Sequence, residues 1–280
     1  MLAQNYPAFE HIVVDGCSTD GTLEVLKRYP HLRVVSEKDR NLYDAINKGM
    51  RMAGGDVVAL LNSDDLYPTG AFTAVAEALA DPTIEMVIGG AEIFAVQGGR
   101  DVVLSRFIGE RATGLSEANA IGNVTVMNSS FWRPSLLERV GLFDDRFRLA
   151  ADKDFWMRLV LAAPRHRLLK QVLYRYLSHE GSLTFSGADQ RDALSLHLLN
   201  LARTRFPECT PGTPAYAAYR RWHAWAVGYR AMRDIAHGRM AGLMGTAREG
   251  FSVDPLWPAR FLARLPVHWF DRAVRRGETN

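Results

Sequence analysis

Residues 56–65 read Asp-Val-Val-Ala-Leu-Leu-Asn-Ser-Asp-Asp, an apolar run that ends in four polar side chains. A short, continuous run of this kind is typical of a strand in a parallel sheet that is covered on both faces. Ligands of parallel sheets bind beyond the carboxyl ends of the strands. The stretch therefore predicts an α/β fold whose binding site includes the loop Asn62–Asp65.

The residues before this stretch alternate between strand and helix patterns. Residues 10–15 and 32–36 read as short apolar strands, and each is followed by a segment whose apolar side chains recur at helical spacing. The second of these helices is expected to end at Gly54-Gly55, because glycine is common just past a helix C-terminus. Two strand–helix units that lead into a third strand form a βαβαβ pattern, which predicts a parallel sheet.

The residues after this stretch predict two parts of different character. The first part continues with a helix over 70–80, strands within 84–108, and helices over 134–140 and 152–163. From about Ser186 onward the pattern is helical only. Residues 1–184 carry 20 Lys and Arg against 23 Asp and Glu, a net charge of −3, whereas residues 185–280 carry 14 against 8, a net charge of +6. We therefore expect an α/β domain at 1–185 and a helical, Arg- and Trp-rich region at 186–280.

The composition excludes several classes of protein. Hydrophobic residues make up 48% and charged residues 23% of the 280 residues, which is typical of a packed globule and argues against disorder. No apolar run approaches the roughly 20 residues that span a bilayer, and the start does not resemble a signal peptide. We therefore expect a cytoplasmic protein. A lysine-rich cluster and a nucleic-acid motif are both lacking, so we expect no nucleic-acid partner.

The carboxylates that follow the 56–61 strand have two interpretations. Carboxylate oxygens at the end of a buried strand can hold Mg²⁺ or Mn²⁺ and leave coordination positions for a diphosphate. Asp and Ser are also common in turns and helix caps, so a plain turn would look the same. This segment alone leaves both interpretations open.

Four segments taken together are more specific than any one of them. Residues 10–22, 43–49, 55–65 and 143–158 resemble, in order and spacing, the motifs of the family 2 glycosyltransferases. The resemblance covers about residues 1–184. It implies a GT-A fold, which is a Rossmann-like, mostly parallel sheet flanked by helices. It also implies a nucleotide-sugar donor, a divalent Mn²⁺ or Mg²⁺ cofactor and an inverting displacement.

The resemblance assigns roles to residues that bind the donor. Asp15 matches the acid that binds the nucleobase, and Gly16 stands where many members have a second acid. Arg40 or Asn41 lies where a residue that contacts the base or phosphate is expected, and Arg40 is taken as the candidate. Asn62 and Asp64 match an Asp-x-Asp motif, with Asn62 as a neutral oxygen for ribose or metal and Asp64 as the principal metal ligand.

The resemblance also assigns the chemistry. Asp152 matches the catalytic base, and Ala151 stands where many members have a neighbouring glutamate. His179 is expected beside the diphosphate or metal, because neutral imidazole is a good ligand for Mn²⁺. From the residues alone, Asp152 could equally be a helix N-cap, and His179 an exposed loop histidine. Asn128 lies where the family lines its sugar pocket, although a buried amide at a strand end would look similar.

The sequence begins inside a segment that is normally preceded by more of the fold. Members of the family start with a strand, a Tyr-Asn loop and a helix that ends in Gln-x-Tyr-Pro, and this chain begins with that last segment at Gln4–Pro7. We therefore expect the first strand–helix unit, about 30 residues long, to be missing. Without its strand, the edge of Ile12–Val14 would be unpaired.

The sequence thus predicts an inverting, metal-dependent glycosyltransferase that acts on a hydroxyl acceptor, such as a saccharide or a lipid-linked sugar, in cell-surface polysaccharide or glycolipid assembly. The alternative is a catalytically inactive binding or scaffold protein that keeps the fold. Aromatic and arginine side chains within residues 213–240 leave two further interpretations. They could contact an anionic membrane surface at the inner face of the cell membrane, or pack in a helical core.

Overall fold

The computed structural model describes residues 1–121, 127–179 and 188–263. These residues belong to two compact units, of which one falls within Met1–Asn119 and Val124–His179 and the other within Ala120–Asn123 and Glu180–Asn280. The predicted boundary near residue 185 lies outside the described residues and stays a prediction. In the described ranges, no helix has both the length and the apolar character needed to cross a membrane.

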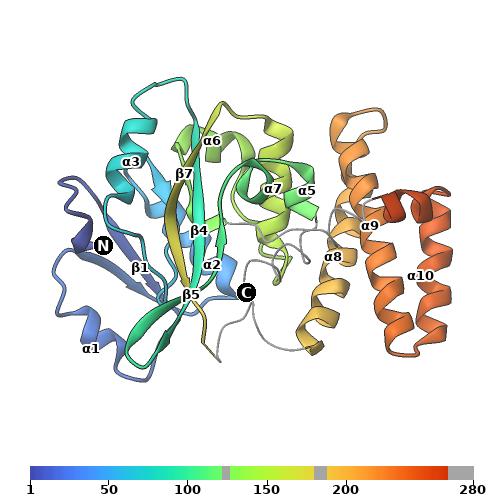
Figure 1. The fold of residues 1–280 in the computed structure, drawn as a ribbon, viewed down its shortest axis with the longest axis horizontal. Helices are drawn as coiled ribbons and strands as arrows, with labels where there is room; N and C mark the ends of the chain where they lie inside the picture. The colour runs from blue at the N-terminus through green and yellow to red at the C-terminus, as the bar shows by residue number, and fades with distance from the viewer. Residues whose placement is uncertain (122–126, 180–187, 264–280) are drawn as a thin grey trace. The chain divides into compact units, whose positions relative to one another are not determined.

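The first unit contains all the strands of the described chain and most of its short helices (Figure 1). Its strands are β1 (His11–Asp15), β2 (Leu32–Ser36), β3 (Val58–Ala59), β4 (Met86–Gln97), β5 (Arg100–Phe107), β6 (Ser130–Trp132) and β7 (His166–Leu177). Its helices are α1 (Thr22–Leu26), α2 (Leu42–Met52), α3 (Ala71–Ala78), α4 (Glu110–Thr113), α6 (Pro134–Val140) and α7 (Ala151–Ala162), and the short helix α5 spans Glu117–Ile121. Single turns of 3₁₀ helix lie at Leu2–Gln4 and Met127–Ser129.

Strands β1 and β2 form a parallel pair, in register from His11 opposite Leu32 to Asp15 opposite Ser36. Helix α2 packs on β1. A Cβ added at Gly49 of α2 would lie 3.5 Å from the side chain of Val14, so the helix lies close to the strand. In the described residues, β1 pairs with β2 alone.

The remaining five strands form a second sheet built around β4. Strand β4 is buried from Met86 to Phe94 and pairs with β5, β6 and β7, while β3 pairs with β6. Figure 1 shows β4 and β7 running side by side. Gly89 permits this approach, because an added Cβ would lie 2.3 Å from the Leu173 side chain. Large apolar side chains, among them Trp132 and Phe155, fill the core of the unit.

The predicted α/β class with C-terminal helices is confirmed, and its sheets are more mixed than the βαβαβ pattern suggests. Among the described strands, β1–β2 and β4–β7 are parallel, whereas β3–β6, β4–β5 and β4–β6 are antiparallel. The strand predicted over 56–61 pairs only at Val58 and Ala59. The apolar run is longer than the strand, because only these two residues have a described backbone partner in β6.

The second unit consists of helices α8 (Ala188–Glu208), α9 (Pro214–Ala236) and α10 (Met240–Val253). Helix α9 packs against both α8 and α10. Its aromatic residues Tyr219, Trp222 and Trp225 are buried, so they form a helical core, and the interpretation that they contact a membrane is wrong for these three side chains. The helical pattern expected from Ser186 onward continues past residue 263 into a segment that lies outside the described residues.

Candidate active site

Two segments of the first unit that are far apart in the chain meet at Asp64 and His179. Asp64 lies in the loop after β3, and His179 lies two residues past the end of β7. The imidazole Nε2 of His179 is 2.9 Å from the Asp64 carboxylate, across 115 residues of sequence. Both side chains are about two-fifths exposed, so a ligand can reach them. These two predicted metal ligands are therefore adjacent.

Asp65, the next residue, ties the loop that carries Asp64 to β7, the strand that precedes His179. Its carboxylate is buried and accepts three hydrogen bonds of 2.8 Å, from the Asn62 amide, the Tyr174 hydroxyl and the backbone N–H of Leu177. Burial raises the pKa of Asp65, although these hydrogen bonds to the charged form oppose the shift. The sequence analysis gave Asp65 no role of its own.

The Tyr174 hydroxyl connects Asp65 to two further residues of the predicted site. It accepts from the backbone N–H of Asn62 at 3.1 Å and from the Asn128 amide at 2.9 Å, while it donates to Asp65. Burial strongly raises the pKa of Tyr174, so the hydroxyl keeps its proton and remains a donor. Asn128 is thus a half-buried amide bonded to this hydroxyl, next to the loop that carries Asn62.

Asp152, the predicted catalytic base, lies in the first turn of α7. The N-cap of this helix is Ala150, so the interpretation of Asp152 as the N-cap is wrong. The Tyr43 hydroxyl of α2 lies against Asp152, and burial and the negative charge of Asp152 raise the pKa of Tyr43. Ala150 supplies no capping side chain to the first turn of α7.

The position of Tyr43 is fixed by contacts between α2 and the segment before α7. The Asn47 amide donates to the Phe143 carbonyl at 2.7 Å and accepts from the Phe143 N–H at 3.0 Å, and all these groups are buried. The Phe143 ring stacks on Tyr43 on one side and on Phe155 on the other. These contacts therefore fix α2 relative to α7 and place Tyr43 beside Asp152.

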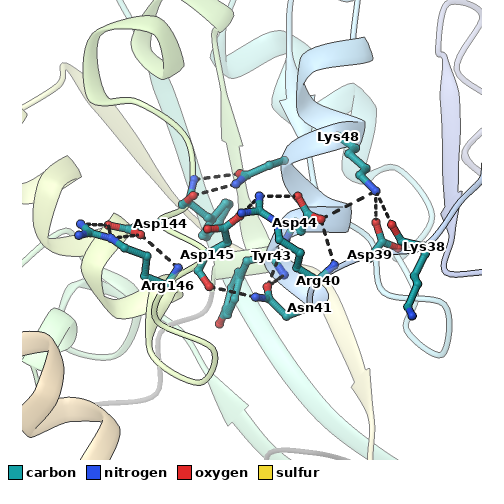
Figure 2. A network of polar contacts seen from close by, with 12 residues as sticks. Lys38, Asp39, Arg40, Asn41, Tyr43, Asp44, Lys48, Asp144, Asp145 and Arg146 are labelled. Atoms are coloured by element: carbon teal, nitrogen blue, oxygen red, sulfur yellow. Dashed lines mark hydrogen bonds and ion pairs between the residues drawn. The ribbon is translucent and has the colours of Figure 1, made fainter.

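Arg40 belongs to a network of charged residues at the start of α2 (Figure 2). Its guanidinium forms an ion pair with Asp44 at 3.0 Å and another with Asp145. Asn41 caps α2 and donates from its amide to the Asp145 carbonyl at 2.9 Å. The Arg40 side chain is 71% exposed, so it can reach a ligand, but its described partners are carboxylates.

Figure 2 also shows Lys48, which makes polar contacts at the other end of this network. The Lys48 ammonium lies 2.6 Å from Asp39 and 2.9 Å from Glu37, and these contacts raise its pKa. Hydrogen bonds from Arg40 lower the pKa of Asp44 to about 2. Asp44, Arg40 and Lys48 therefore stay charged at neutral pH.

Asp15 ends β1, where the resemblance places the nucleobase. Its Oδ2 accepts from the Ser36 hydroxyl at 2.6 Å and from the N–H groups of Cys17 and Ser18, and hydrogen bonds from Ser18 and Ser36 lower the pKa of Asp15. Its Oδ1 has one long described contact, 3.4 Å from Ser18 N. A Cβ at Gly16 would lie 3.4 Å from an oxygen of Asp39, so the carboxylate of Asp39 lies close to the position that a second acid would occupy.

Tyr176 of β7 lies within electrostatic reach of both Asp65 and Asp152, the predicted base. Burial raises the pKa of this tyrosine, and the negative charges of Asp65 and Asp152 both act on it in the same direction. The structure therefore brings Asn62, Asp64 and His179 together at the loop after β3, and the charges of both Asp65 and Asp152 act on Tyr176. Asp15 lies in the other sheet of that unit and has its own set of partners.

The site also includes residues that the sequence analysis did not single out. Tyr43, Asp65 and Tyr174 each hold a predicted residue in place. Tyr174 and Tyr176 alternate along β7, and such a pair places two hydroxyls on one face of a strand. This pattern is the signal that could have drawn attention to β7.

The donor set at Asp64 and His179 fits a divalent cation in part. One carboxylate and one imidazole are ligands that Mn²⁺ accepts, and a diphosphate and water would supply the remaining oxygens. No group of three or more His, Cys, Asp or Glu side chains in the described ranges is arranged to hold a metal ion. The protein would thus supply two ligands, and the rest of the shell would come from the donor.

The fold is that of known glycosyltransferases. The crystal structure of Staphylococcus aureus TarS 1–349 in complex with UDP-GlcNAc matches with a TM-score of 0.55 at 20% identity, covering 92% of this chain and 86% of that one. The complex of the same protein with UDP matches with a TM-score of 0.53 at 19% identity, covering 92% and 85%. The predicted GT-A fold is therefore confirmed.

The sequence comparisons identify the family. A model described as glycosyl transferase family 2 matches residues 1–138, and this part of the chain belongs to that family. An uncharacterized glycosyltransferase of Mycobacterium tuberculosis is 32% identical over 167 residues, which are 57% of this chain and 60% of that protein. A putative teichuronic acid biosynthesis glycosyltransferase of Bacillus subtilis is 31% identical over 103 residues, 35% of this chain and 41% of that protein. The match thus spans about 60% of the length of the first of these relatives.

Proposed function

We propose that this chain is an inverting glycosyltransferase that moves a sugar from a nucleotide-diphosphate donor to a hydroxyl group. The observation that carries the proposal is the contact between Asp64 and His179, 2.9 Å apart at the ends of two segments of a family 2 domain. A carboxylate and an imidazole at that point suit a metal-bound diphosphate. A scaffold protein would not need these two side chains to meet at an exposed position.

Asp152 is the group that would take the proton. In an inverting displacement the acceptor oxygen forms a bond to the anomeric carbon while the bond from that carbon to the diphosphate oxygen breaks. The electron pair of the breaking bond leaves with the nucleoside diphosphate, and the acceptor proton passes to a carboxylate within hydrogen-bond reach. Asp152 is half-buried, and the Tyr43 hydroxyl beside it can orient its carboxylate.

Asp64 and His179 would hold the cation, Mn²⁺ or Mg²⁺. When bound, such a cation neutralises charge that develops on the departing diphosphate. Asn62 lies in the same loop, where its amide donates to Asp65 and leaves its carbonyl oxygen for the ribose or the cation. The presence of Asn62 and Asp64 on one loop, with His179 beside Asp64, supports the assignment of the donor diphosphate to this side of the site.

Asp15 and Arg40 would bind the other end of the donor. Asp15 Oδ1 has the capacity to accept an N–H of a nucleobase, since the other carboxylate oxygen takes the shorter described hydrogen bonds. Arg40 would have to exchange its ion pairs with Asp44 and Asp145 for a phosphate contact. We infer that Asp15 contributes more to donor affinity than Arg40.

The named relatives support an acceptor at the cell surface. One is a putative teichuronic acid biosynthesis glycosyltransferase, and another is a PGL/p-HBAD biosynthesis glycosyltransferase of Mycobacterium bovis, 28% identical over 159 residues, 54% of this chain and 57% of that protein. We propose a saccharide or lipid-linked acceptor for this chain on that basis.

Contact with a lipid surface would have to come from side chains outside the helical core. Met240, Met244 and Phe251 of α10 are more than half exposed, and Arg248 of the same helix is exposed as well. Exposed apolar side chains with a cation suit an anionic bilayer surface. Co-sedimentation with anionic vesicles, reduced in the variant Met244→Glu and absent with neutral vesicles, is the expected result; equal sedimentation of the two proteins would contradict it.

The proposal is tested by donor turnover. Purified protein is incubated with Mn²⁺ and a panel of nucleotide sugars that begins with UDP-GlcNAc, and release of nucleoside diphosphate is measured. We expect turnover of at least one donor by the wild type, and a loss of at least a hundredfold in Asp152→Asn and Asp64→Asn. No turnover by wild-type protein that is folded, with or without added acceptors, would favour the scaffold alternative.

A further inference from the structure

Asp65 is buried next to Asp64, one of the residues that would bind the donor diphosphate. Its three hydrogen-bond donors come from the loop after β3 and from two positions of β7. Asn62 lies at the start of the loop, Tyr174 lies within β7, and Leu177 is the last residue of β7. One carboxylate therefore ties the loop after β3 to the end of β7.

The pairing of these two segments has a regular geometry. Leu66 and Arg175 exchange two backbone hydrogen bonds, of 3.0 and 2.8 Å. One residue earlier in the loop, the Asp65 side chain takes the N–H of Leu177, two residues further along β7. One residue earlier again in the loop, Asp64 contacts His179, which lies two residues beyond Leu177. The Asp65 carboxylate thus replaces the backbone pairing that stops at Leu66, and it continues the contact between the segments as far as the two candidate ligands.

We propose that Asp65 is a positioning residue that fixes the distance between Asp64 and His179, and so sets the affinity of this pair for a metal-bound nucleoside diphosphate. The inference rests on the proposed function of Asp64 and His179. Buried groups that orient metal ligands commonly change metal affinity or activity by about 10 to 100-fold when they are replaced.

The substitution Asp65→Asn tests this role because of how the hydrogen bonds are divided. Oδ2 accepts from both Asn62 and Tyr174, whereas Oδ1 accepts from Leu177 alone. An asparagine has one acceptor oxygen, so the orientation that keeps two hydrogen bonds turns its NH₂ group toward the Leu177 N–H. The bond to the end of β7 is then lost, while the side chain keeps its shape.

Glu92 provides a matched control. It is buried to the same extent as Asp65, at 6% exposure, and it also holds β7, through the ion pair of its carboxylate with Arg175 at 3.0 Å. Glu92→Gln therefore removes a buried charge that stabilises the same strand. A role for Asp65 that is limited to stability would make the two variants behave alike toward ligands.

The experiment measures binding of Mn²⁺ in the presence of UDP, from the loss of the electron paramagnetic resonance signal of aqueous Mn²⁺, on full-length wild type and both variants. We expect Asp65→Asn to bind about tenfold or more weakly and Glu92→Gln to bind within twofold of the wild type. Affinity of Asp65→Asn within twofold of the wild type would overturn the inference, as would an equal loss in both variants. If Asp65→Asn does not fold, Tyr174→Phe removes one of the three hydrogen bonds; we then expect a loss of about threefold, and an unchanged affinity overturns the inference.

Hydrogen exchange separates this inference from the proposed function. The Leu177 amide should exchange at least tenfold faster in Asp65→Asn than in the wild type or in Glu92→Gln. If wild-type protein does not bind Mn²⁺ with UDP, the proposed metal site fails, and with it the claim about affinity. The claim about position is then decided by the exchange of Leu177, and an unchanged rate overturns it.

Discussion

The Tyr43 side chain of α2 lies beside Asp152 in the first turn of α7, and the negative charge of Asp152 acts on its hydroxyl. A hydroxyl at this position can orient the Asp152 carboxylate. In the proposed mechanism the direction of the Asp152 carboxylate decides whether it meets the acceptor hydroxyl. Tyr43, which takes no part in the proton transfer itself, therefore controls the direction of the Asp152 carboxylate.

We expect Tyr43→Phe to lower kcat about tenfold with KM changed less than twofold, because the donor site is intact and only the base is released. Steady-state kinetics with a donor that the wild type turns over provides the measurement. Tyr219→Phe, which alters a buried tyrosine of α9, is the control and should keep wild-type kcat. A rise in KM at constant kcat would show that Tyr43 serves donor binding instead.

Asp64 and His179 should act as a unit. Asp64→Asn and His179→Ala are each expected to weaken Mn²⁺ binding in the presence of UDP by about 10 to 100-fold, by analogy with other losses of metal-site groups. Because both side chains would meet the same cation, the double variant should lose much less than the product of the single losses. Mn²⁺ titrations of the four proteins form the cycle. Strictly multiplicative losses would indicate that the two side chains do not share a ligand.

Asn47 should be critical for the stability of the first unit. Replacement by alanine leaves the Phe143 N–H and carbonyl without their side-chain partner in a buried place, which costs about 2 to 4 kcal/mol. Urea unfolding measures the loss. Asn200→Ala, at an exposed position of α8 next to Arg203, is the control and should change stability by less than about 0.5 kcal/mol. Equal stability of the Asn47 variant and the wild type would refute the role of this amide.

The second unit should lose stability in acid through Glu249. Burial acts to raise the pKa of Glu249, but hydrogen bonds from Arg203 and His223 outweigh it and lower the pKa from 4.5 to about 2. A lowered folded-state pKa adds stability that is complete above about pH 4.5 and disappears as the pH falls toward about 2. After allowance for solvent screening, this contribution is about 1 to 2 kcal/mol.

The check on Glu249 is the variant Glu249→Gln, which should be less stable than the wild type at pH 7 and nearly equal to it near pH 2.5. Hydrogen exchange of α9 and α10 reports the opening of this unit. Glu208→Gln, which alters an exposed ion pair with Arg205, should be close to the wild type throughout. A stability difference for Glu249→Gln that does not change with pH would contradict the assignment.

Local patterns in the sequence predicted individual elements well. Pro134 begins α6 as expected, and α2 ends at Met52, before the glycine pair. These signals succeed because proline and glycine act on their own stretch of backbone. Strand pairing was less accessible. The parallel pairing of β4 with β7 joins residues about 80 apart, and no local pattern in either strand specifies its neighbour.

The candidate site shows the same limit. Asp64, Asp152 and His179 could be named because their motifs stand in a familiar order. Asp65 could not be distinguished from Asp64 in a run of polar residues, since its burial depends on the packing of β7 against this loop. Tyr174 reads as a core residue of an apolar strand, and its hydroxyl acquires a function only through the loop that folds against it.

Single-turnover kinetics, with the donor that wild-type protein turns over, measures whether Asp152 takes the proton from the acceptor. The rate of sugar transfer at saturating Mn²⁺ and donor is compared between the wild type and Asp152→Asn. We expect an unchanged donor affinity and a transfer rate that falls at least a hundredfold. Transfer by Asp152→Asn at a rate within threefold of the wild type would contradict it.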